Sequence, residues 1–298
     1  MDVSVIIVNF NGGDVPLACV SSIKRECLSC SFEIIVVDNA STDGSSDRLK
    51  SVFPEIRLFK TGANLGFGRA NNLGAQVATG EYLFFLNPDT LLRNDAIALF
   101  LDASRNSEAK PKTGVLGSRL EDGTGRPAIS SGRFDTPLSI AIRRVGSLAA
   151  LLFPRGIEKI ARNRYWANDS QMKCDYITGA DLFMKKKLFM AAGGFDSQFF
   201  MYYEDQDLQW SISKMGFSAK IIDGPSIVHL ESASSGGGIH KMSMVDSSAL
   251  TFVHKRYGKT ARAALGMFFY ICSFFFPLIG KASFIESAAY RAGLRSDQ

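Results

Sequence analysis

Short apolar runs alternate with amphipathic stretches over the first hundred residues. Each run has the length and the β-branched or aromatic content of a buried strand, and polar turns separate it from stretches of helical periodicity. The predicted strands are Val3–Val8, Phe32–Val37, Ile56–Lys60 and Tyr82–Leu86. Because near-continuous apolar strands that alternate with helices are typical of sheets covered on both faces, the pattern predicts an α/β fold with a doubly wound, mostly parallel sheet.

Polar side chains stand at the ends of three of these predicted strands. Asn9 and Asp38 follow two of them, and Asn87-Pro88-Asp89 follows the fourth, where Pro88 cannot continue a central strand. The carboxyl ends of parallel strands meet at one edge of a sheet, where open α/β sheets bind ligands. A carboxylate and an amide at that edge suit a divalent cation and a phosphate. A proline turn with a surface aspartate is the alternative reading of the same three residues.

Three acidic residues lie within the four-residue stretch Glu204-Asp205-Gln206-Asp207, which opens a predicted helix after the aromatic stretch Phe200–Tyr203. A carboxylate that is screened from water can have a raised pKa and act as a general base. Acids in a first helical turn also serve simply as partners of the helix dipole. His229 follows a later strand and becomes a candidate ligand if it faces Asp89; otherwise it is a structural histidine.

The C-terminal part differs in character from the rest of the chain. Residues 263–280 contain no charged side chain, and cations precede the stretch. Crossing a bilayer takes about 20 apolar residues, and Pro277 interrupts this run, so we expect an interfacial hairpin or re-entrant segment at a membrane surface. A buried core helix is the alternative. We therefore predict a catalytic domain over residues 1–255 and a basic, Phe-rich, membrane-associating helical tail over 256–298.

The overall charge limits the classes of partner. The chain has a net charge of +5 and a sequence pI near 8.9. This mild basicity fits anionic substrates or an anionic membrane surface, and the sequence carries no signature of nucleic-acid binding. We expect no nucleic-acid partner.

The ordered set of these motifs resembles the inverting glycosyltransferases of family 2, which have the GT-A fold with a Rossmann-like sheet. The stretches that carry the resemblance are Val3–Asn11, Val36–Gly44, Asn64–Gly74, Gly80–Thr90, Gly179–Gly216 and the neighbourhood of His229. Within the family they resemble the rhamnosyltransferase-like branch, whose members build bacterial O-antigen, capsule and other surface polysaccharides.

The resemblance implies roles for individual residues. It assigns the nucleoside and the nucleotide pocket to Val8, Asn9, Asp38, Asn64, Gly66, Asn71 and Asn87. Asn87-Pro88-Asp89 occupies the place of the family's Asp-x-Asp motif, so Asp89 would bind Mg²⁺ or Mn²⁺ and His229 would complete the metal shell. Because Asn87 stands where many relatives have Asp, the donor's diphosphate would supply the missing negative charge.

The same resemblance divides the acid cluster. Asp205 would be the base that deprotonates the acceptor hydroxyl, and Glu204 or Asp207 would orient the acceptor. The implied reaction moves L-rhamnose from dTDP-rhamnose to a glycan on a polyprenyl diphosphate, at the cytoplasmic face of the bacterial inner membrane.

Other donors and other classes of protein stay open at this point. UDP-hexose, UDP-N-acetylhexosamine and UDP-galactofuranose donors are alternatives within the family. A nucleotide-sugar pyrophosphorylase would need a Gly-rich loop with a nearby Arg and Lys after the first strand, which Asn9–Asp14 does not provide. A non-enzymatic nucleotide-binding membrane protein would keep the sheet edge but would not need the acid cluster.

Overall fold

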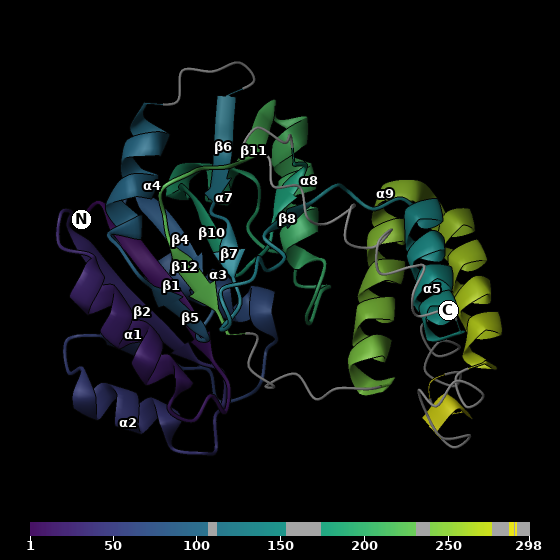
Figure 1. Ribbon diagram of the computed structural model, residues 1–298, viewed down its shortest axis with the longest axis horizontal. Helices are drawn as coiled ribbons and strands as arrows, with labels where there is room; N and C mark the ends of the chain where they lie inside the picture. Colours follow the sequence, from purple (N-terminus) through teal and green to yellow (C-terminus); the bar gives the residue numbers. More distant parts are fainter. Residues whose placement is uncertain (107–111, 153–173, 231–238, 276–285, 289, 291–298) are drawn as a thin grey trace. The chain divides into compact units, whose positions relative to one another are not determined.

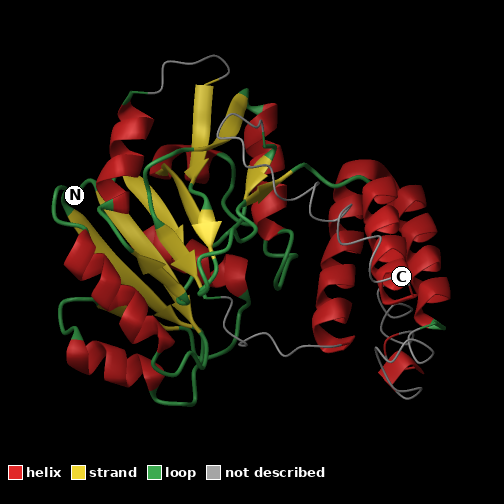
Figure 2. Cartoon of the chain, in the orientation of Figure 1, coloured by secondary structure: helices red, strands yellow, loops and turns green. Residues whose placement is uncertain are grey.

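The computed structural model describes residues 1–106, 112–152, 174–230, 239–275, 286–288 and 290. Contacts divide the chain into two compact units. The first, here called the sheet unit, contains residues 1–134, 168–197 and 204–234, and the second, the helical unit, contains residues 135–167, 198–203 and 235–298. Figures 1 and 2 show that the strands belong to the sheet unit.

The sheet unit is built on a seven-stranded sheet with the order β11-β6-β10-β4-β1-β2-β3. Its strands are β1 (Val3–Asn9), β2 (Phe32–Asp38), β3 (Arg57–Lys60), β4 (Tyr82–Leu86), β6 (Lys112–Gly117), β10 (Asp181–Lys185) and β11 (Phe217–Ile221). Strand β10 runs antiparallel to β4 and β6, and the other described pairings in this sheet are parallel. The four strands predicted near the N-terminus agree with β1 to β4 within one residue at each end.

Alternation along the strands creates two apolar layers. In β1, Val5 and Ile7 pack in one layer, whereas Ile6 and Val8 pack in the other. The first layer is covered by α1 (Val15–Glu26), α2 (Ser45–Val52) and α4 (Ala96–Arg105). The second is covered by α3 (Phe67–Val77), α7 (Lys186–Ala191) and α8 (Glu204–Lys214). Burial on both faces explains why the strands are apolar without interruption.

Two smaller sheets complete the sheet unit. Strands β5 (Thr90–Leu92), β12 (Ile227–His229) and β7 (Leu120–Glu121) form one, with β12 in the middle. Strands β8 (Ser131–Gly132) and β9 (Tyr176–Ile177) form the other. The register of β5 with β12 matters for the site, because it pairs Thr90 with His229.

The helical unit contains α5 (Pro137–Leu152) and α9 (Ile239–Ser273). Helix α9 has non-helical backbone at Gly258, where φ is +88° and ψ is 175°. The predicted domain boundary after residue 255 falls inside α9, and contacts instead group α9 with residues 135–167 and 198–203. Periodicity cannot reveal such a grouping, because it joins segments that are far apart in the sequence.

No helix in the part of the chain that the structure describes is long and apolar enough to cross a membrane. Of the uncharged stretch 263–280, residues 276–280, including Pro277, lie outside the described residues.

Candidate functional site

Asn87, Asp89 and His229 meet at the carboxyl end of β4. Strand β4 ends at Leu86, the turn follows, and pairing of β5 with β12 brings His229 back to the turn. The Nε2 atom of His229 lies 3.2 Å from Oδ1 of Asp89 and 3.3 Å from Nδ2 of Asn87. The backbone N–H of Leu230 also donates to the Asp89 carbonyl at 2.9 Å. His229 therefore faces Asp89, which was the condition for its candidacy as a ligand.

This cluster offers part of a coordination shell. The Asp89 carboxylate is a hard oxygen donor, the His229 imidazole is a nitrogen donor, and Asn87 adds an amide oxygen. In the described ranges, no group of three or more His, Cys, Asp or Glu side chains is placed to hold a metal ion. The residues thus fit a divalent cation whose remaining ligands come from a phosphate-bearing substrate. The ligand roles of Asp89 and His229 stay predictions.

Asp181, the first residue of β10, is a buried carboxyl at the same sheet edge that the sequence reasoning missed. It pairs with Leu86 in the register of β4 and β10. Its Oδ2 accepts hydrogen bonds from the N–H and the hydroxyl of Ser118, both at 2.6 Å. Burial raises its pKa to about 7, against the opposing effects of Ser118 and His229. An aspartate directly before the apolar stretch Leu182–Met184 was the available signal.

The acid cluster lies in the first turn of α8, and Asp205 is tied to the turn that precedes β10. One carboxylate oxygen of Asp205, Oδ2, accepts from the N–H of Gly179 at 2.9 Å. The other, Oδ1, accepts from the N–H of Gln206 at 2.7 Å. The neighbouring carbonyl of Ala180 accepts from the N–H of Asn87 at 3.0 Å. The turn at 179–180 thus contacts both Asp205 and Asn87, one of the three residues of the Asn87–Asp89–His229 cluster.

Glu204 and Asp205 differ in exposure. Asp205 is partly exposed, whereas 5% of Glu204 is exposed and its Oε2 has no hydrogen-bond partner among the described residues. Burial raises the pKa of Glu204, and repulsion from the Asp205 carboxylate raises it further. Burial also raises the pKa of Asp205, although hydrogen bonds from Gln206 and Gly179 oppose this. Asp207 is buried as well, and its acceptor-binding role remains a prediction.

Two glycines bring the start of α3 against the start of α8. Gly66 has a φ of +83°, which a residue with a side chain rarely adopts. A Cβ atom at Gly68 would lie 2.9 Å from the Cβ of Phe195 and 3.5 Å from the Cγ of Glu204. Residue 68 must therefore be glycine for α3 to approach Phe195 this closely, and Glu204 then lies at ordinary van der Waals distance from α3.

The predicted nucleoside residues Val8 and Asn9 are buried at the end of β1. The Nδ2 of Asn9 donates to the hydroxyls of Ser45 and Ser46, both at 2.8 Å. Its Oδ1 has no hydrogen-bond partner in the described ranges. The Asn9 side chain therefore holds the start of α2 against the end of β1, and any contact it makes with a nucleoside remains a prediction.

Asp38 is buried at the end of β2, and its Oδ1 accepts from the N–H of Ser41 at 3.1 Å. The residue after it, Asn39, was not among the predicted site residues. Its Nδ2 donates to Oδ1 of Asn64 at 2.9 Å, and its Oδ1 accepts from the N–H of Leu65 at 2.8 Å. Asn39 therefore links the end of β2 to the turn before α3, and its position directly after the strand was the signal.

Asn64 and Asn71 shape the entry to α3. Asn64 Oδ1 accepts from the N–H of Gly66 at 3.0 Å. Asn71 is buried, and its Nδ2 donates to the Phe67 carbonyl at 3.1 Å. These bonds fix the loop that faces the sheet edge, as a nucleotide pocket requires, and their roles toward a nucleotide stay predictions.

The fold is GT-A-like, with a mostly parallel sheet and flanking helices. The structure is similar to the mannosyltransferase PcManGT from Pyrobaculum calidifontis, solved in complex with GDP-Man and Mn²⁺. The TM-score is 0.58 at 19% sequence identity, and the match covers 99% of this chain and 75% of that one. GalNAc-T7 with UDP, GalNAc and Mn²⁺ matches with a TM-score of 0.55 at 16% identity, over 86% of this chain and 50% of that one.

The sequence identifies the family. Residues 4–175 match the profile described as Glycosyl transferase family 2, which is more than half of the chain. The protein therefore belongs to glycosyl transferase family 2 and is an enzyme. It is also 28% identical over 217 residues to N-acetylglucosaminyl-diphospho-decaprenol L-rhamnosyltransferase of Mycobacterium tuberculosis, with 68% of each chain covered. The family and the likeness to a rhamnosyltransferase agree with the expectations from the motifs.

Proposed function

We propose that this protein is an inverting glycosyltransferase that moves L-rhamnose from dTDP-rhamnose to a lipid-linked glycan in surface-polysaccharide synthesis. The observation that carries the proposal is the placement of Asp205, a partly exposed carboxylate. The turn at 179–180 hydrogen-bonds to Asp205 on one side and to Asn87 of the Asn87–Asp89–His229 cluster on the other. A base beside a site for a diphosphate is the pair of groups that a single displacement at an anomeric carbon requires. The name of the mycobacterial relative supports the choice of sugar and of a lipid-linked acceptor.

The donor would lie along the carboxyl edge of the sheet. Asp38 and the loop held by Asn39 and Asn64 would bound the nucleoside. Asp89 and His229 would hold a divalent cation, which when bound supplies Lewis-acid stabilisation of negative charge on the departing diphosphate. Mg²⁺ or Mn²⁺ fits a donor set of this kind.

Asp205 would take the proton from the attacking acceptor hydroxyl. Each of its oxygens accepts one backbone hydrogen bond, so the carboxylate is held in one orientation and retains lone pairs for the acceptor. Glu204, whose raised pKa favours its protonated form, would donate a hydrogen bond that orients the acceptor. One displacement with no covalent enzyme intermediate inverts the anomeric configuration.

The helical unit would meet the membrane surface that carries the acceptor. Met267 and Ile271 share one face near the end of α9, Phe274 and Phe275 follow directly after the helix, and all four side chains are exposed. Lys259, about two turns of helix before Met267, is exposed as well. In α5 a second set of exposed apolar residues shares a face: Leu138, Ile142 and Val145. Apolar helical faces flanked by cations favour the interface of an anionic leaflet, which supports a site at the cytoplasmic face of the inner membrane.

A donor panel tests the proposed activity. The full chain is incubated with a short-chain N-acetylglucosaminyl-diphospho-prenol and with dTDP-rhamnose, UDP-glucose, UDP-N-acetylglucosamine or UDP-galactofuranose, with and without Mg²⁺. We expect nucleoside-diphosphate release to be fastest with dTDP-rhamnose and to depend on Mg²⁺. Faster release from a UDP-sugar would replace the donor assignment, and no release from any donor would overturn the proposed function.

Flotation with vesicles tests the membrane assignment. We expect the full chain to float with phosphatidylglycerol vesicles, and the double variant Ile271→Ser, Phe274→Ser to float less. The matched control is Leu28→Ser, which removes an exposed leucine from the sheet unit and should leave flotation unchanged. Equal flotation of the double variant and the parent would contradict a membrane role for this face.

A further inference from the structure

Residues 198–203 form a short segment of the helical unit, although both flanking residues belong to the sheet unit. Phe199 is fully buried, and the Lys255 ammonium lies 5.4 Å from the centre of its ring. The hydroxyl of Ser248 donates to the carbonyl of Met201 at 2.7 Å. Both partners come from α9, so this helix fixes the segment that leads directly into Glu204.

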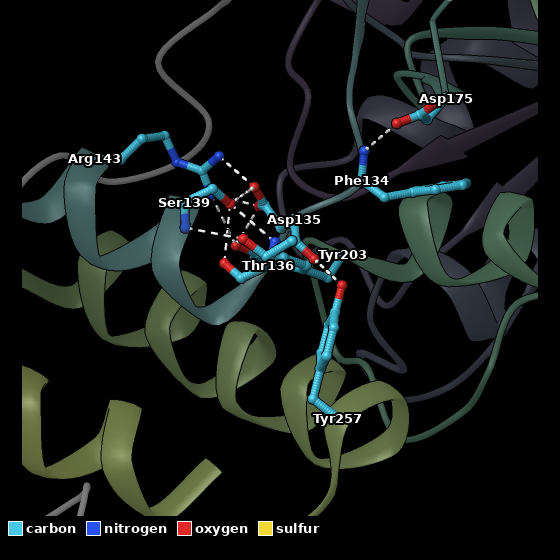
Figure 3. A network of polar contacts seen from close by, with 8 residues as sticks. All are labelled: Phe134, Asp135, Thr136, Ser139, Arg143, Asp175, Tyr203 and Tyr257. Carbon is cyan, nitrogen blue, oxygen red and sulfur yellow. Dashed lines mark hydrogen bonds and ion pairs between the residues drawn. The ribbon is translucent and has the colours of Figure 1, made fainter. Parts of the chain in front are cut away.

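Tyr203, the last residue of this segment, is held by a charged network (Figure 3). Its hydroxyl donates to Oδ2 of Asp135 at 2.9 Å, and the Arg143 guanidinium pairs with both oxygens of the same carboxylate. The hydroxyl of Tyr257 donates to the Asp135 carbonyl at 2.9 Å, and the Tyr203 ring packs 5.4 Å from that of Phe252. Because Asp135 is buried and paired with Arg143, its carboxylate is a strong and fixed acceptor.

The backbone at this point has an unusual conformation. Tyr202 and Tyr203 have φ values of +71° and +68°, in the left-handed region. For residues with a side chain this costs about 1–2 kcal/mol each. Helix α8 begins at the next residue, so the left-handed pair sets the direction in which Glu204 and Asp205 enter the first turn. Conformations of this kind persist where surrounding contacts hold them, and they occur preferentially at active sites.

We propose that Tyr203 is a positioning residue for Glu204 and Asp205, and that Asp135 and Arg143 act through it. The bond from the Tyr203 hydroxyl to Asp135 keeps the left-handed backbone, and this backbone places the first turn of α8. The inference rests on the proposed function in one respect, namely that Asp205 is the base. The device itself consists only of contacts within the helical unit and the peptide bond that joins Tyr203 to Glu204.

The helical unit offers a matched control. Tyr290 is also a buried tyrosine whose hydroxyl donates to a buried aspartate, Asp246, and that aspartate is paired with Arg144. This second triad has the same chemistry and lies in the same unit, but Tyr290 is far in sequence from the acid cluster. A purely structural role for tyrosine–aspartate–arginine triads would make the two tyrosines equivalent.

The experiment compares Tyr203→Phe with Tyr290→Phe in the full chain. We expect Tyr203→Phe to lower kcat by about 10-fold to 100-fold, the size of effect that a misplacement near 1 Å produces, with the donor KM unchanged. We also expect the acid limb of its pH profile to move to lower pH, because a loosened carboxyl pair gains water and loses its raised pKa. Tyr290→Phe should leave kcat and the acid limb as in the parent.

Hydrogen exchange gives a readout that does not need activity. In Tyr203→Phe the amides of residues 207–209, the first in α8 that donate to helical carbonyls, should exchange faster, while those of residues 212–214 keep the parent's protection. Should Tyr203→Phe fail to fold, Asp135→Asn weakens the same anchor by removing the ion pair with Arg143, and it should show the same pattern more weakly. Parent-like exchange, kcat and acid limb in the variant that folds would overturn the proposal.

The two proposals fail in different ways. If the parent releases no nucleoside diphosphate from any donor, the proposed function is wrong, and exchange at residues 207–209 still decides whether Tyr203 positions the turn. If the parent is active and neither the kinetics nor the exchange respond to Tyr203→Phe, the positioning role alone is wrong.

Discussion

Two glutamates of the sheet unit, Glu33 and Glu204, differ in how their carboxyl groups are hydrogen-bonded. Glu33 lies near the start of β2, where Oε1 accepts from the hydroxyl of Ser4 at 2.7 Å and from the N–H of Thr79 at 2.6 Å, and Oε2 accepts from Arg57 at 2.6 Å. Glu204 lies beside the carboxyl ends of the strands, and one of its oxygens has no partner in the described chain.

The pKa values follow from these surroundings. Burial tends to raise the pKa of Glu33, but hydrogen bonds from Ser4, Thr79 and Arg57 outweigh it and lower the pKa to about 2. At Glu204, burial and the charge of Asp205 both raise the pKa, and little opposes them. A satisfied carboxylate joins strands together, whereas an unsatisfied one that holds a proton is available for chemistry. Glu33 thus contributes to stability at one end of the sheet, and Glu204 has the surroundings that the proposed catalysis requires.

The largest expected effect is that of Asp205→Asn on turnover. An amide can still accept the hydrogen bond from Gly179 but cannot take a proton, so kcat should fall roughly 10²–10⁴-fold. Donor affinity, measured by calorimetry with the nucleoside diphosphate, should stay the same. Turnover within a few-fold of the parent would show that another group is the base.

A loss of stability is expected for Glu33→Gln, with no role in chemistry. The ion pair with Arg57 disappears, and the lowering of the Glu33 pKa from 4.5 to about 2, discounted because water screens this partly exposed pair, corresponds to about 1–2 kcal/mol of unfolding free energy at neutral pH. Because the folded pKa is lowered, this contribution is present above the unfolded pKa of 4.5 and disappears as the pH falls toward about 2. Urea unfolding as a function of pH measures it, and a difference that grows in acid would contradict the assignment.

Glu204→Gln should change stability in the opposite direction. Because the folded pKa of Glu204 is raised, the parent loses stability as the pH rises from the unfolded pKa of about 4.3 toward the folded value. The amide avoids this loss, so the variant should gain about 1–2 kcal/mol over the parent at alkaline pH and almost nothing near the unfolded pKa. If the free energy of unfolding depended on pH equally in the two proteins, the pKa of Glu204 would not be raised in the folded state.

The sequence predicted the sheet well because strand signals are local. The apolar runs at 3–8, 32–37 and 82–86 contain their own length and period, and polar residues mark where they stop. The parallel order then brings Asn9, Asp38 and Asn87 to one edge without further information. The approach of His229 to Asp89 was only conditional, since it depends on pairing between β5 and β12, which are more than 130 residues apart.

Other features could not be read from local patterns. Asp181 was missed because its burial depends on β6 and β10 pairing across a long and irregular stretch. The second role of Asn72, which exchanges two hydrogen bonds with the backbone of Phe195, also needs a contact over more than 120 residues. The membership of residues 198–203 in the helical unit was hidden for the same reason, since an aromatic stretch before a helix looks the same in either setting.

The pH dependence of kcat/KM in the parent tests most directly whether Asp205, a carboxyl with a raised pKa at the sheet edge, is the base. The base must be ionised, so the rate should fall as the pH drops through the raised pKa of Asp205, well above the ordinary carboxyl value of about 4. Glu33 keeps its contribution to folding down to a much lower pH, so unfolding should not cause this limb. We predict that the acid limb of the parent lies well above the ordinary carboxyl range. We also predict that the residual activity of Asp205→Asn lacks this limb. A limb at about 4, or the same limb in Asp205→Asn, would contradict it.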